Sequence, residues 1–339
     1  MNDKGIERKH RVSRRSFLAD TVCGSVAAGV VGASVSRLAA AAEPAAAPTP
    51  ANSADAPGPL PKGKIGSLEI TRLILGTNII THYLHARGLR YVKDLSMRYN
   101  TDEKVLETFA EAERQGVNTF MTHHDARIVK LLKEHHDRHG GKLHWLVSPT
   151  PQESKSVEEF SEVVAKLAGL GVNAIYVHGA AADPLVQSNK GDTLAKFVDV
   201  IKKTGLPAGV AAHDLKVVQF CEAAKIPCDF YVKTFHHLNY PTAPRPEEIT
   251  DVYEETPHGY WCSNPDETTR VMQSVKQPWI AYKVMAAGAI PPRDAFRYAF
   301  SRGADFILAG MFDFQIAENA KVTQEMCTRI KERERPWRA

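Results

Sequence analysis

The sequence predicts an α/β fold, a (β/α)8 TIM barrel with an N-terminal β-hairpin. From Lys62 onward, short β-branched or apolar runs alternate with amphipathic stretches of helical period. Eight such pairs occupy about 275 residues, which is the usual size of this barrel. A doubly wound open sheet is the rival architecture, but its Gly-rich phosphate turn is missing from Leu75–Ile80, directly after the first expected barrel strand.

Each strand is expected where a short apolar run is bounded by turn residues. In order these are Ile70–Gly76, Val117–Met121, Leu143–Val147, Ala174–Val177, Ala208–Ala212, Phe230–Thr234, Trp279–Val284 and Phe306–Ala309. Helices are expected near 103–115, 126–137, 157–169, 192–204, 215–224, 265–275, 291–302 and 314–332. A hairpin from Lys62–Leu68 into Ile70 is expected to plug the barrel floor.

The segment before the barrel is interpreted as an export signal and a tether. Residues 1–42 resemble a twin-arginine signal peptide, because Ser-Arg-Arg-Ser-Phe-Leu at 13–18 precedes a weakly apolar run and a small-residue tract ending at Ala42. We therefore expect export by the twin-arginine machinery to the periplasm or another exported location, with no stable membrane span after cleavage. The Ala/Pro-rich residues 43–61 are expected to form a disordered linker, and 62–339 the barrel.

Charge and cysteine content narrow the function classes. The chain has 43 Lys and Arg against 39 Asp and Glu, but the basic excess lies in residues 1–42, so the remainder is formally neutral. Nucleic-acid binding is therefore not expected. The cysteines after residue 42 match no metal knuckle or CxxC spacing, and whether Cys221 and Cys228 pair stays open.

Polar side chains follow the expected strands at the end where TIM barrels carry their chemistry. The residues are Thr77-Asn78, Thr122-His123-His124-Asp125, Ser148, His178, His213-Asp214, Lys233, His236-His237 and Lys283. We expect these groups to meet at one rim and to form a site, although single rings could also only fill the barrel mouth. His135, His136 and His139 lie at a charged helix end and are expected to be solvated.

Imidazole groups at this rim have two interpretations. His123, His124, His178, His213 and His237 offer ligand atoms for a divalent metal such as Zn, Mn, Fe or Ni. Adjacent strand residues point in opposite directions, so one member of each His pair is expected to reach the centre. Without a metal, the same rings and Asp125 form an acid–base set.

The two rim lysines and two long loops complete the expected site. Lys283 follows an apolar strand and could act as a base, an imine-forming amine or an electrostatic clamp, or could pair with a carboxylate. Loops over 78–100 and 237–264 are expected to be lids. Expected substrate-binding residues are Tyr240, Trp261, Arg90 and Lys233, and aromatic and Arg side chains of this kind suit a polyol or sugar.

Four segments resemble the aldo/keto reductase superfamily. They are Ile70–Thr77, Gly116–Thr122, Ile175–Gly179 and Gly310–Asn319, and the resemblance covers the chain from Gly66 to about Asn319. It implies a barrel with His178 as the catalytic histidine, and NADP as cofactor contacted by Glu318 and Asn319. Its other catalytic positions differ here. Met121 stands at the Asp position, Ala126 at or near the Tyr position, and Ser148-Pro149 where the family has Lys.

Three functions follow as hypotheses. The first is an exported enzyme that isomerises, epimerises or cleaves a small polyol, sugar or sugar acid by acid–base chemistry, with or without a metal. In it, His178, His213, Asp125 and Lys283 are catalytic. The second is an NADP-dependent oxidoreductase with tightly bound cofactor. The third is a non-catalytic sugar-binding barrel.

Overall fold

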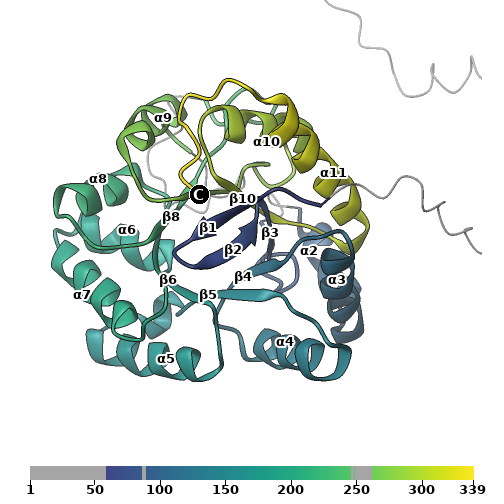
Figure 1. Ribbon diagram of the computed structural model, residues 1–339, viewed down its shortest axis with the longest axis horizontal. Helices are drawn as coiled ribbons and strands as arrows, with labels where there is room; N and C mark the ends of the chain where they lie inside the picture. The colour runs from purple at the N-terminus through teal and green to yellow at the C-terminus, as the bar shows by residue number, and fades with distance from the viewer. Residues whose placement is uncertain (1–58, 86–88, 246–247, 249–261) are drawn as a thin grey trace, which may run out of the picture. The chain divides into compact units, whose positions relative to one another are not determined.

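A computed structural model of the chain describes residues 59–85, 89–245, 248 and 262–339. Eight parallel strands close into a barrel in the order β10-β3-β4-β5-β6-β7-β8-β9, with helices arranged around it (Figure 1). The strands are β3 (Leu73–Gly76), β4 (Thr119–His123), β5 (His144–Ser148), β6 (Ala174–Val177), β7 (Ala208–Ala212), β8 (Phe230–Thr234), β9 (Trp279–Tyr282) and β10 (Phe306–Gly310). The predicted fold class is confirmed.

The helices lie close to their predicted positions. They are α3 (Asp102–Arg114), α4 (Ala126–His139), α5 (Val157–Gly169), α7 (Gly191–Lys202), α8 (Leu215–Ala223), α9 (Pro265–Ser274), α10 (Pro292–Ser301) and α11 (Asp313–Arg329). Two helices were not expected, α2 (Arg90–Tyr99) and α6 (Gly179–Gln187), and a short 3-10 turn, η2, spans Pro151–Glu153. The first expected lid therefore contains a helix.

The N-terminal hairpin closes one end of the barrel, as predicted. Its strands β1 (Lys62–Ile65) and β2 (Leu68–Thr71) pair antiparallel, and Figure 1 shows them across the centre of the strand ring. Ile65 and Ile70 are buried in the interior cluster. Leu60, which was expected to lie in the disordered linker, is also buried.

The expected first strand, Ile70–Gly76, is in fact split at Arg72. Its guanidinium donates to the carbonyl oxygens of Asp305 at 2.9 Å and Ala339 at 2.7 Å. The Thr71 hydroxyl bridges the break by donating to the Leu73 carbonyl at 2.8 Å. The chain thus leaves the hairpin at Thr71 and enters the barrel at Leu73.

Two of the predicted strand ends also shift for local reasons. Val117 does not begin a strand, because its N–H closes the end of α3 by donating to the Ala112 carbonyl at 2.9 Å. The strand begins at Thr119 and runs to His123. The seventh barrel strand, expected to reach Val284, ends at Tyr282, because Lys283 has a positive φ of 58° that no strand accommodates.

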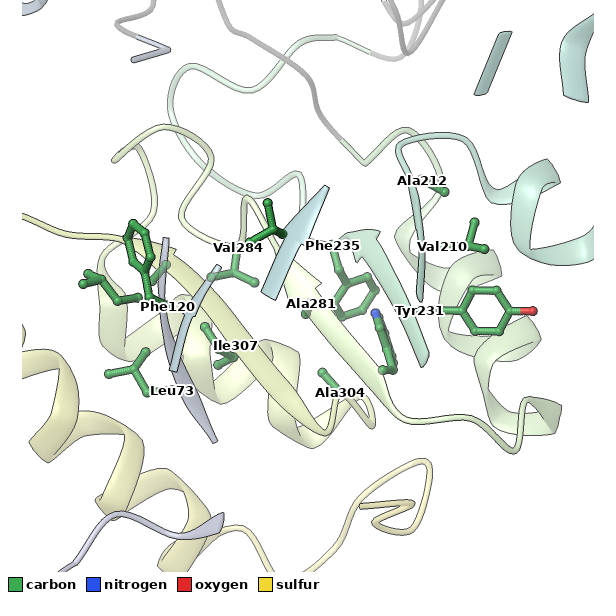
Figure 2. Packing of buried hydrophobic residues seen from close by; sticks show 14 of the residues in the cluster. Leu73, Phe120, Val210, Ala212, Tyr231, Phe235, Ala281, Val284, Ala304 and Ile307 are labelled. Carbon is green, nitrogen blue, oxygen red and sulfur yellow. The ribbon is translucent and has the colours of Figure 1, made fainter. Parts of the chain in front are cut away.

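Strand residues alternate between two cores. Ile74, Met121, Leu146, Tyr176, Ala211, Phe230 and Ile280 form the interior cluster with the hairpin. Their neighbours along the strands pack outward against the helices; this outer cluster includes Leu73, Phe120, Val210, Tyr231, Ala281 and Ile307 (Figure 2). This period of two decides which side chains at the strand ends face the barrel axis.

Three further findings concern the described part of the chain. None of its helices combines the length and apolar character needed to cross a bilayer. Cys221, Cys228, Cys262 and Cys327 are free thiols. His135 was expected to be solvated, but it is 2% exposed and its Nε2 lies 2.9 Å from a Glu113 carboxylate oxygen.

Candidate functional site

Four side chains at the carboxyl ends of the strands lie on the inward-facing side. His123, His178, His213 and Tyr282 each follow an interior residue by two positions, Met121, Tyr176, Ala211 and Ile280 respectively. The pleat therefore directs them toward the barrel axis. The charges of His213, His123 and Lys283 act on the pKa of His178, so these groups lie near one another at the rim.

The best-defined contact in the site joins His213 to a carboxylate of α6. His213 Nδ1 lies 2.7 Å from Asp183 Oδ2, and the Asp183 side chain is completely buried. The same carboxylate accepts the backbone N–H of His213 at 3.0 Å and that of Asp214 at 3.2 Å. A carboxylate with these donors holds the ring proton on Nδ1 and leaves the lone pair on Nε2.

His178 has the opposite arrangement. It caps the N-terminus of α6, where its Nδ1 accepts the backbone N–H of Ala180 at 3.1 Å. Because that nitrogen must carry the lone pair, the proton of the neutral ring is on Nε2. The site therefore contains one imidazole that can accept a proton at Nε2 and one that can donate from Nε2.

Burial keeps these rings neutral. It lowers the pKa of His178 to about 3, with further lowering by His213, His123 and Lys283. The pKa of His213 is also lowered well below its usual value, first by burial and then by the charges of Lys283 and Lys233. Burial likewise lowers the pKa of His123, against the carboxylate of Asp125. A neutral base and a neutral donor thus persist well below pH 6.5.

Lys283 is held at the end of β9 in an unusual backbone conformation. Its φ is 58°, and Ala286 and Ala287 also have positive φ values, of 46° and 55°. Its Nζ lies 2.8 Å from His85 Nε2, and burial followed by the Lys283 charge lowers the pKa of His85 to about 3. Left-handed backbone at non-glycine residues costs free energy and tends to occur at functional sites.

Lys233 does not bind substrate as predicted. Its side chain is completely buried, and its ammonium donates to the backbone carbonyls of His213 at 2.7 Å and Thr234 at 2.9 Å. Lys233 alternates with the interior residue Val232, so its side chain leaves the strand on the outer side. It supports the loop after β7 from below the rim.

The expected divalent-metal site is not formed by the predicted residues. His124 Nδ1 lies 2.7 Å from Glu153 Oε1, away from the axis, as expected for the outward member of its pair. The His237 ring packs against Tyr298 at a centroid distance of 5.2 Å. Among the residues that the structure describes, no group of three or more His, Cys, Asp or Glu side chains could hold a metal ion.

The remaining predicted site residues have mixed outcomes. Asp125 caps α4, because its carboxylate accepts the Ile128 N–H at 3.0 Å. Arg90 is exposed at the start of α2, and the Tyr240 ring lies 5.9 Å from that of His236. Trp261 and most of the second expected lid lie outside the described residues.

His236 supports a loop beside the rim. Its Nε2 accepts the Cys262 N–H at 3.1 Å, and its Nδ1 donates to the His237 carbonyl at 2.9 Å. The ring is 1% exposed. It therefore ties the chain after β8 to the start of the segment leading into α9.

Sequence reasoning missed three residues of the site. Tyr282 could have been found from strand alternation, since it follows Ile280 by two positions; its ring centroid lies 5.5 Å from that of His213. Asp183 lies in the unexpected helix α6, and His85 in a segment classed only as a lid. Only the folded chain brings these two beside His213 and Lys283.

The resemblance implies that NADP is contacted by Glu318 and Asn319, but the segment around these residues does not suit a phosphate group. Here the start of α11 carries Asp313, whose carboxylate accepts the Tyr99 hydroxyl at 2.7 Å and lies 3.4 Å from Lys104 Nζ. Hydrogen bonds from Tyr99, Phe314 and Lys104 lower the pKa of Asp313 despite its partial burial, so it is negatively charged. Glu318 is exposed, and Asn319 is buried within α11. The Asp313 carboxylate already pairs with Lys104 at the start of α11, and its negative charge disfavours a phosphate at the same position.

Comparisons with known proteins support the fold. No family model matches the sequence, and no curated protein is similar to it. The holo form of aldo-keto reductase AKR11C1 from Bacillus halodurans is 13% identical, with a TM-score of 0.51 over 78% of this chain and 91% of that one. Gox0644 in its apo form is 10% identical, with a TM-score of 0.51 over 79% and 93%. A Gox0644 variant in complex with NADPH is 11% identical, with a TM-score of 0.51 over 78% and 88%.

These identities establish a shared barrel and nothing about the reaction. The chain has a TIM barrel fold like that of aldo-keto reductase AKR11C1, and the structural similarity is distant. The choice among the three hypotheses therefore rests on the groups at the rim and not on the fold.

Proposed function

We propose that the chain is an enzyme that binds a small polar carbonyl compound, such as a sugar or sugar acid, at the barrel rim. The reaction is proton transfer beside the carbonyl, as in an isomerase, epimerase or lyase. One observation carries the proposal: Nδ1 of His213 contacts the Asp183 carboxylate, whereas Nδ1 of His178 accepts the Ala180 N–H. These partners favour complementary tautomers in the two rings.

The proton-transfer step uses both rings. His213 Nε2 takes a proton from the carbon next to the carbonyl, and the C–H electron pair moves to form an enolate. His178 Nε2–H and the Lys283 ammonium stabilise the negative oxygen that results. In isomerisation the proton returns to the former carbonyl carbon while the proton of the neighbouring hydroxyl group passes to the enolate oxygen. In epimerisation a proton from water reaches the opposite face of the carbon while protonated His213 releases its proton to solvent. In elimination a β-leaving group departs with its electron pair and takes up the proton from His213. Asp183 compensates the positive charge that develops on His213.

A product screen tests the proposal. The purified chain is incubated with aldoses, ketoses and uronic acids, and product formation is followed by proton NMR. We expect at least one member of the panel to be converted, with loss of about 10²-fold or more in kcat for His213→Asn. Binding without conversion by the wild type would instead favour the non-catalytic sugar-binding hypothesis.

An oxidoreductase is the second candidate, because one similar barrel is an aldo-keto reductase and another was solved in complex with NADPH. In that reaction His178 would orient the substrate carbonyl, and a bound nicotinamide would supply hydride. The charge of Asp313 argues against a phosphate group at the start of α11. Denaturing extraction of the purified chain, followed by absorbance and fluorescence of the extract, decides this: a stoichiometric nicotinamide supports the second candidate over the first.

Export by the twin-arginine route remains a proposal that rests on the sequence motif. Substitution of both Arg14 and Arg15 by Lys should abolish delivery of the chain to the periplasm in a fractionation experiment, because the receptor reads the arginine pair. A chain that is exported equally well without the pair would contradict the proposal.

A further inference from the structure

Residue 213 is held by two buried charges of opposite sign. Asp183, from α6, accepts the backbone N–H of His213 and lies beside its ring Nδ1. Lys233, from β8, donates to the backbone carbonyl of the same residue at 2.7 Å. Both charged side chains are 0% exposed. Opposite ends of one residue are thus bound by opposite charges from two other elements.

A contribution to folding stability does not by itself account for the buried charges of Asp183 and Lys233. Removing an ammonium and a carboxylate from water costs several kcal/mol each, and an apolar pair of similar volume is often at least as stable. Burial raises the pKa of Asp183, and the backbone N–H groups of His213 and Asp214 together with the Lys233 charge oppose that rise and favour the carboxylate. Both groups also hydrogen-bond to the backbone of residue 213. The arrangement is therefore specific for the position and the electrostatic environment of this histidine.

We propose that Asp183 and Lys233 act together as a clamp that positions His213 and sets its tautomer and its neutral state. Asp183 holds the proton on Nδ1, so that Nε2 is the basic atom. Lys233 fixes the carbonyl of the same residue and places a positive charge below the ring, which opposes its protonation. This inference rests on the proposed role of His213 as the base; Lys233 is a positioning residue and touches no substrate.

The other groups around His213 act on its protonation as well. Lys283, His85 and His178 lie close enough to interact with the ring electrostatically. Asp214 interacts with Asp183, and the Tyr282 hydroxyl lies near Gly179, beside the His213 ring. Among them Lys233 and Lys283 both lower the pKa of His213. Loss of the Lys233 charge should therefore raise the pKa of His213, with Lys283 still in place.

Histidine NMR on the full chain tests the clamp directly. The chain is labelled with ¹⁵N-histidine, and His213 is assigned by the signal lost in His213→Asn. Long-range ¹H–¹⁵N correlations then report its tautomer and its protonation midpoint. For the wild type we expect the Nδ1–H tautomer and a midpoint below pH 6.5. In Lys233→Met the midpoint should rise by about 1 pH unit.

Two further variants and one control make the result of the Lys233→Met experiment interpretable. Lys233→Gln retains a hydrogen-bond donor for the carbonyls but loses the charge, so it should show the same rise even if Lys233→Met does not fold. Asp183→Asn should convert His213 to a mixture of tautomers. Lys202→Met is the matched control, because Lys202 pairs with Asp229 at the protein surface and should leave His213 unchanged.

The clamp is contradicted if His213 keeps the same midpoint in a folded Lys233→Gln chain, or if the wild-type ring carries its proton on Nε2. These spectra need no substrate, so they are independent of the product screen. A clamp that is confirmed while no sugar is converted would refute the proposed reaction and leave the clamp in place. Conversion of a sugar, together with an unchanged His213 midpoint in Lys233→Gln, would support the proposed reaction and refute the clamp.

Discussion

At the scale of single residues, the site depends on which nitrogen of each histidine carries the proton. Burial lowers the pKa of both His213 and His178, but one ring contacts a carboxylate and the other a backbone N–H. Their Nε2 atoms consequently have opposite hydrogen-bonding capacity. Two chemically identical side chains are thereby prepared for different roles by their partners alone.

Loss of the Asp183 carboxylate should disable the base. In Asp183→Asn, the amide no longer enforces the Nδ1–H tautomer, so we expect kcat to fall by about 10²-fold or more on any converted substrate. Asp192→Asn is the matched control, since Asp192 is exposed in the first turn of α7. Steady-state kinetics of the two variants give the comparison; equal kcat values would contradict the assigned role.

The activity should persist into acid. Burial lowers the pKa of His178 to about 3 and also lowers that of His213, so both rings are deprotonated above those lowered values. A plot of kcat/KM against pH should therefore stay level from pH 8 to below pH 6, and its acid limb should lie below the usual histidine pKa of about 6.5. A half-maximal point near pH 6.5 that moves with substitution of His213 would refute this.

The site residues that could be predicted from the sequence lie at strand ends, whereas those that could not be predicted lie on a helix and a loop. His178 and His213 follow predicted strands, and a barrel brings strand ends together, so their meeting was predictable. Asp183 and His85 reach the site from a helix and a loop whose paths depend on tertiary packing. Lys233 and His124 point away from the barrel axis because side chains alternate along a strand. This alternation tells which side of the barrel wall a residue faces only when the strand register is known.

At the scale of elements, α6 links the strand ends to the site. It begins directly after His178, and its Asp183 lies beside the next strand's terminal histidine. Sequence did not predict this helix, because it contains Pro184 and follows the strand without a linker. In the helix α2 only Ser96 is buried, and its large apolar residues Tyr91 and Leu95 are exposed, so it does not pack a core-facing apolar side as the other helices do.

Gly179 at the start of α6 makes room for the site. An added Cβ would lie 3.0 Å from His213 Cε1 and 3.1 Å from the Tyr282 hydroxyl oxygen. We expect Gly179→Ala to displace the His213 ring and to lower kcat by about 10-fold or more, since a small misplacement of a reacting group is costly. The free energy of unfolding, measured by thermal unfolding, should change by only about 1 kcal/mol.

A second glycine supplies the control for this substitution. Gly169 ends α5, and within the described part of the chain no side chain or neighbouring backbone lies within 4 Å of its added Cβ. Gly169→Ala should therefore leave kcat unchanged and stabilise the fold by up to about 1 kcal/mol. Similar kinetic losses in both variants would show that the effect at Gly179 comes from the helix and not from the crowded ring.

His236 should make the chain's stability dependent on pH. Burial lowers its folded-state pKa to about 4, whereas an unfolded histidine has a pKa of about 6.5. Between these values the unfolded chain binds more protons, so the free energy of unfolding falls as pH decreases from 6.5 toward 4, by about 1 kcal/mol per pH unit. In His236→Gln, urea titrations at pH 7 and pH 5 should differ less than in the wild type; an equal difference would contradict this.

At the scale of the whole molecule, the two ends of the barrel have different tasks. The hairpin and the C-terminal residues 330–339 close one end, where Arg72 and Asp305 bind parts of the chain far apart in sequence. The opposite end carries the histidines and Lys283. The barrel was predictable from the number, order and length of the apolar runs. The sequence pattern does not specify the directions of the side chains at the rim, and among the described residues these directions leave no cluster that could hold a metal ion.

A buried ion pair fastens the closed end. Arg335 Nη1 donates to Asp305 Oδ2 at 2.6 Å, and both side chains are fully buried. Arg335→Met leaves the Asp305 charge without this partner, so the free energy of unfolding should fall by about 3–5 kcal/mol. The exposed Arg329→Met should change it by less than about 0.5 kcal/mol. Denaturant titration measures both, and equal values would contradict the assignment.

The central claim is that the rim moves a proton beside a substrate carbonyl, with His213 as the base. The most direct measurement is deuterium uptake from D₂O at the carbon next to the carbonyl of a converted sugar, followed by NMR for wild type, His213→Asn and Asp192→Asn. We predict uptake by the wild type and the Asp192 variant, and its loss in His213→Asn. Conversion without any deuterium at that carbon, or uptake that survives the loss of His213, would contradict the claim.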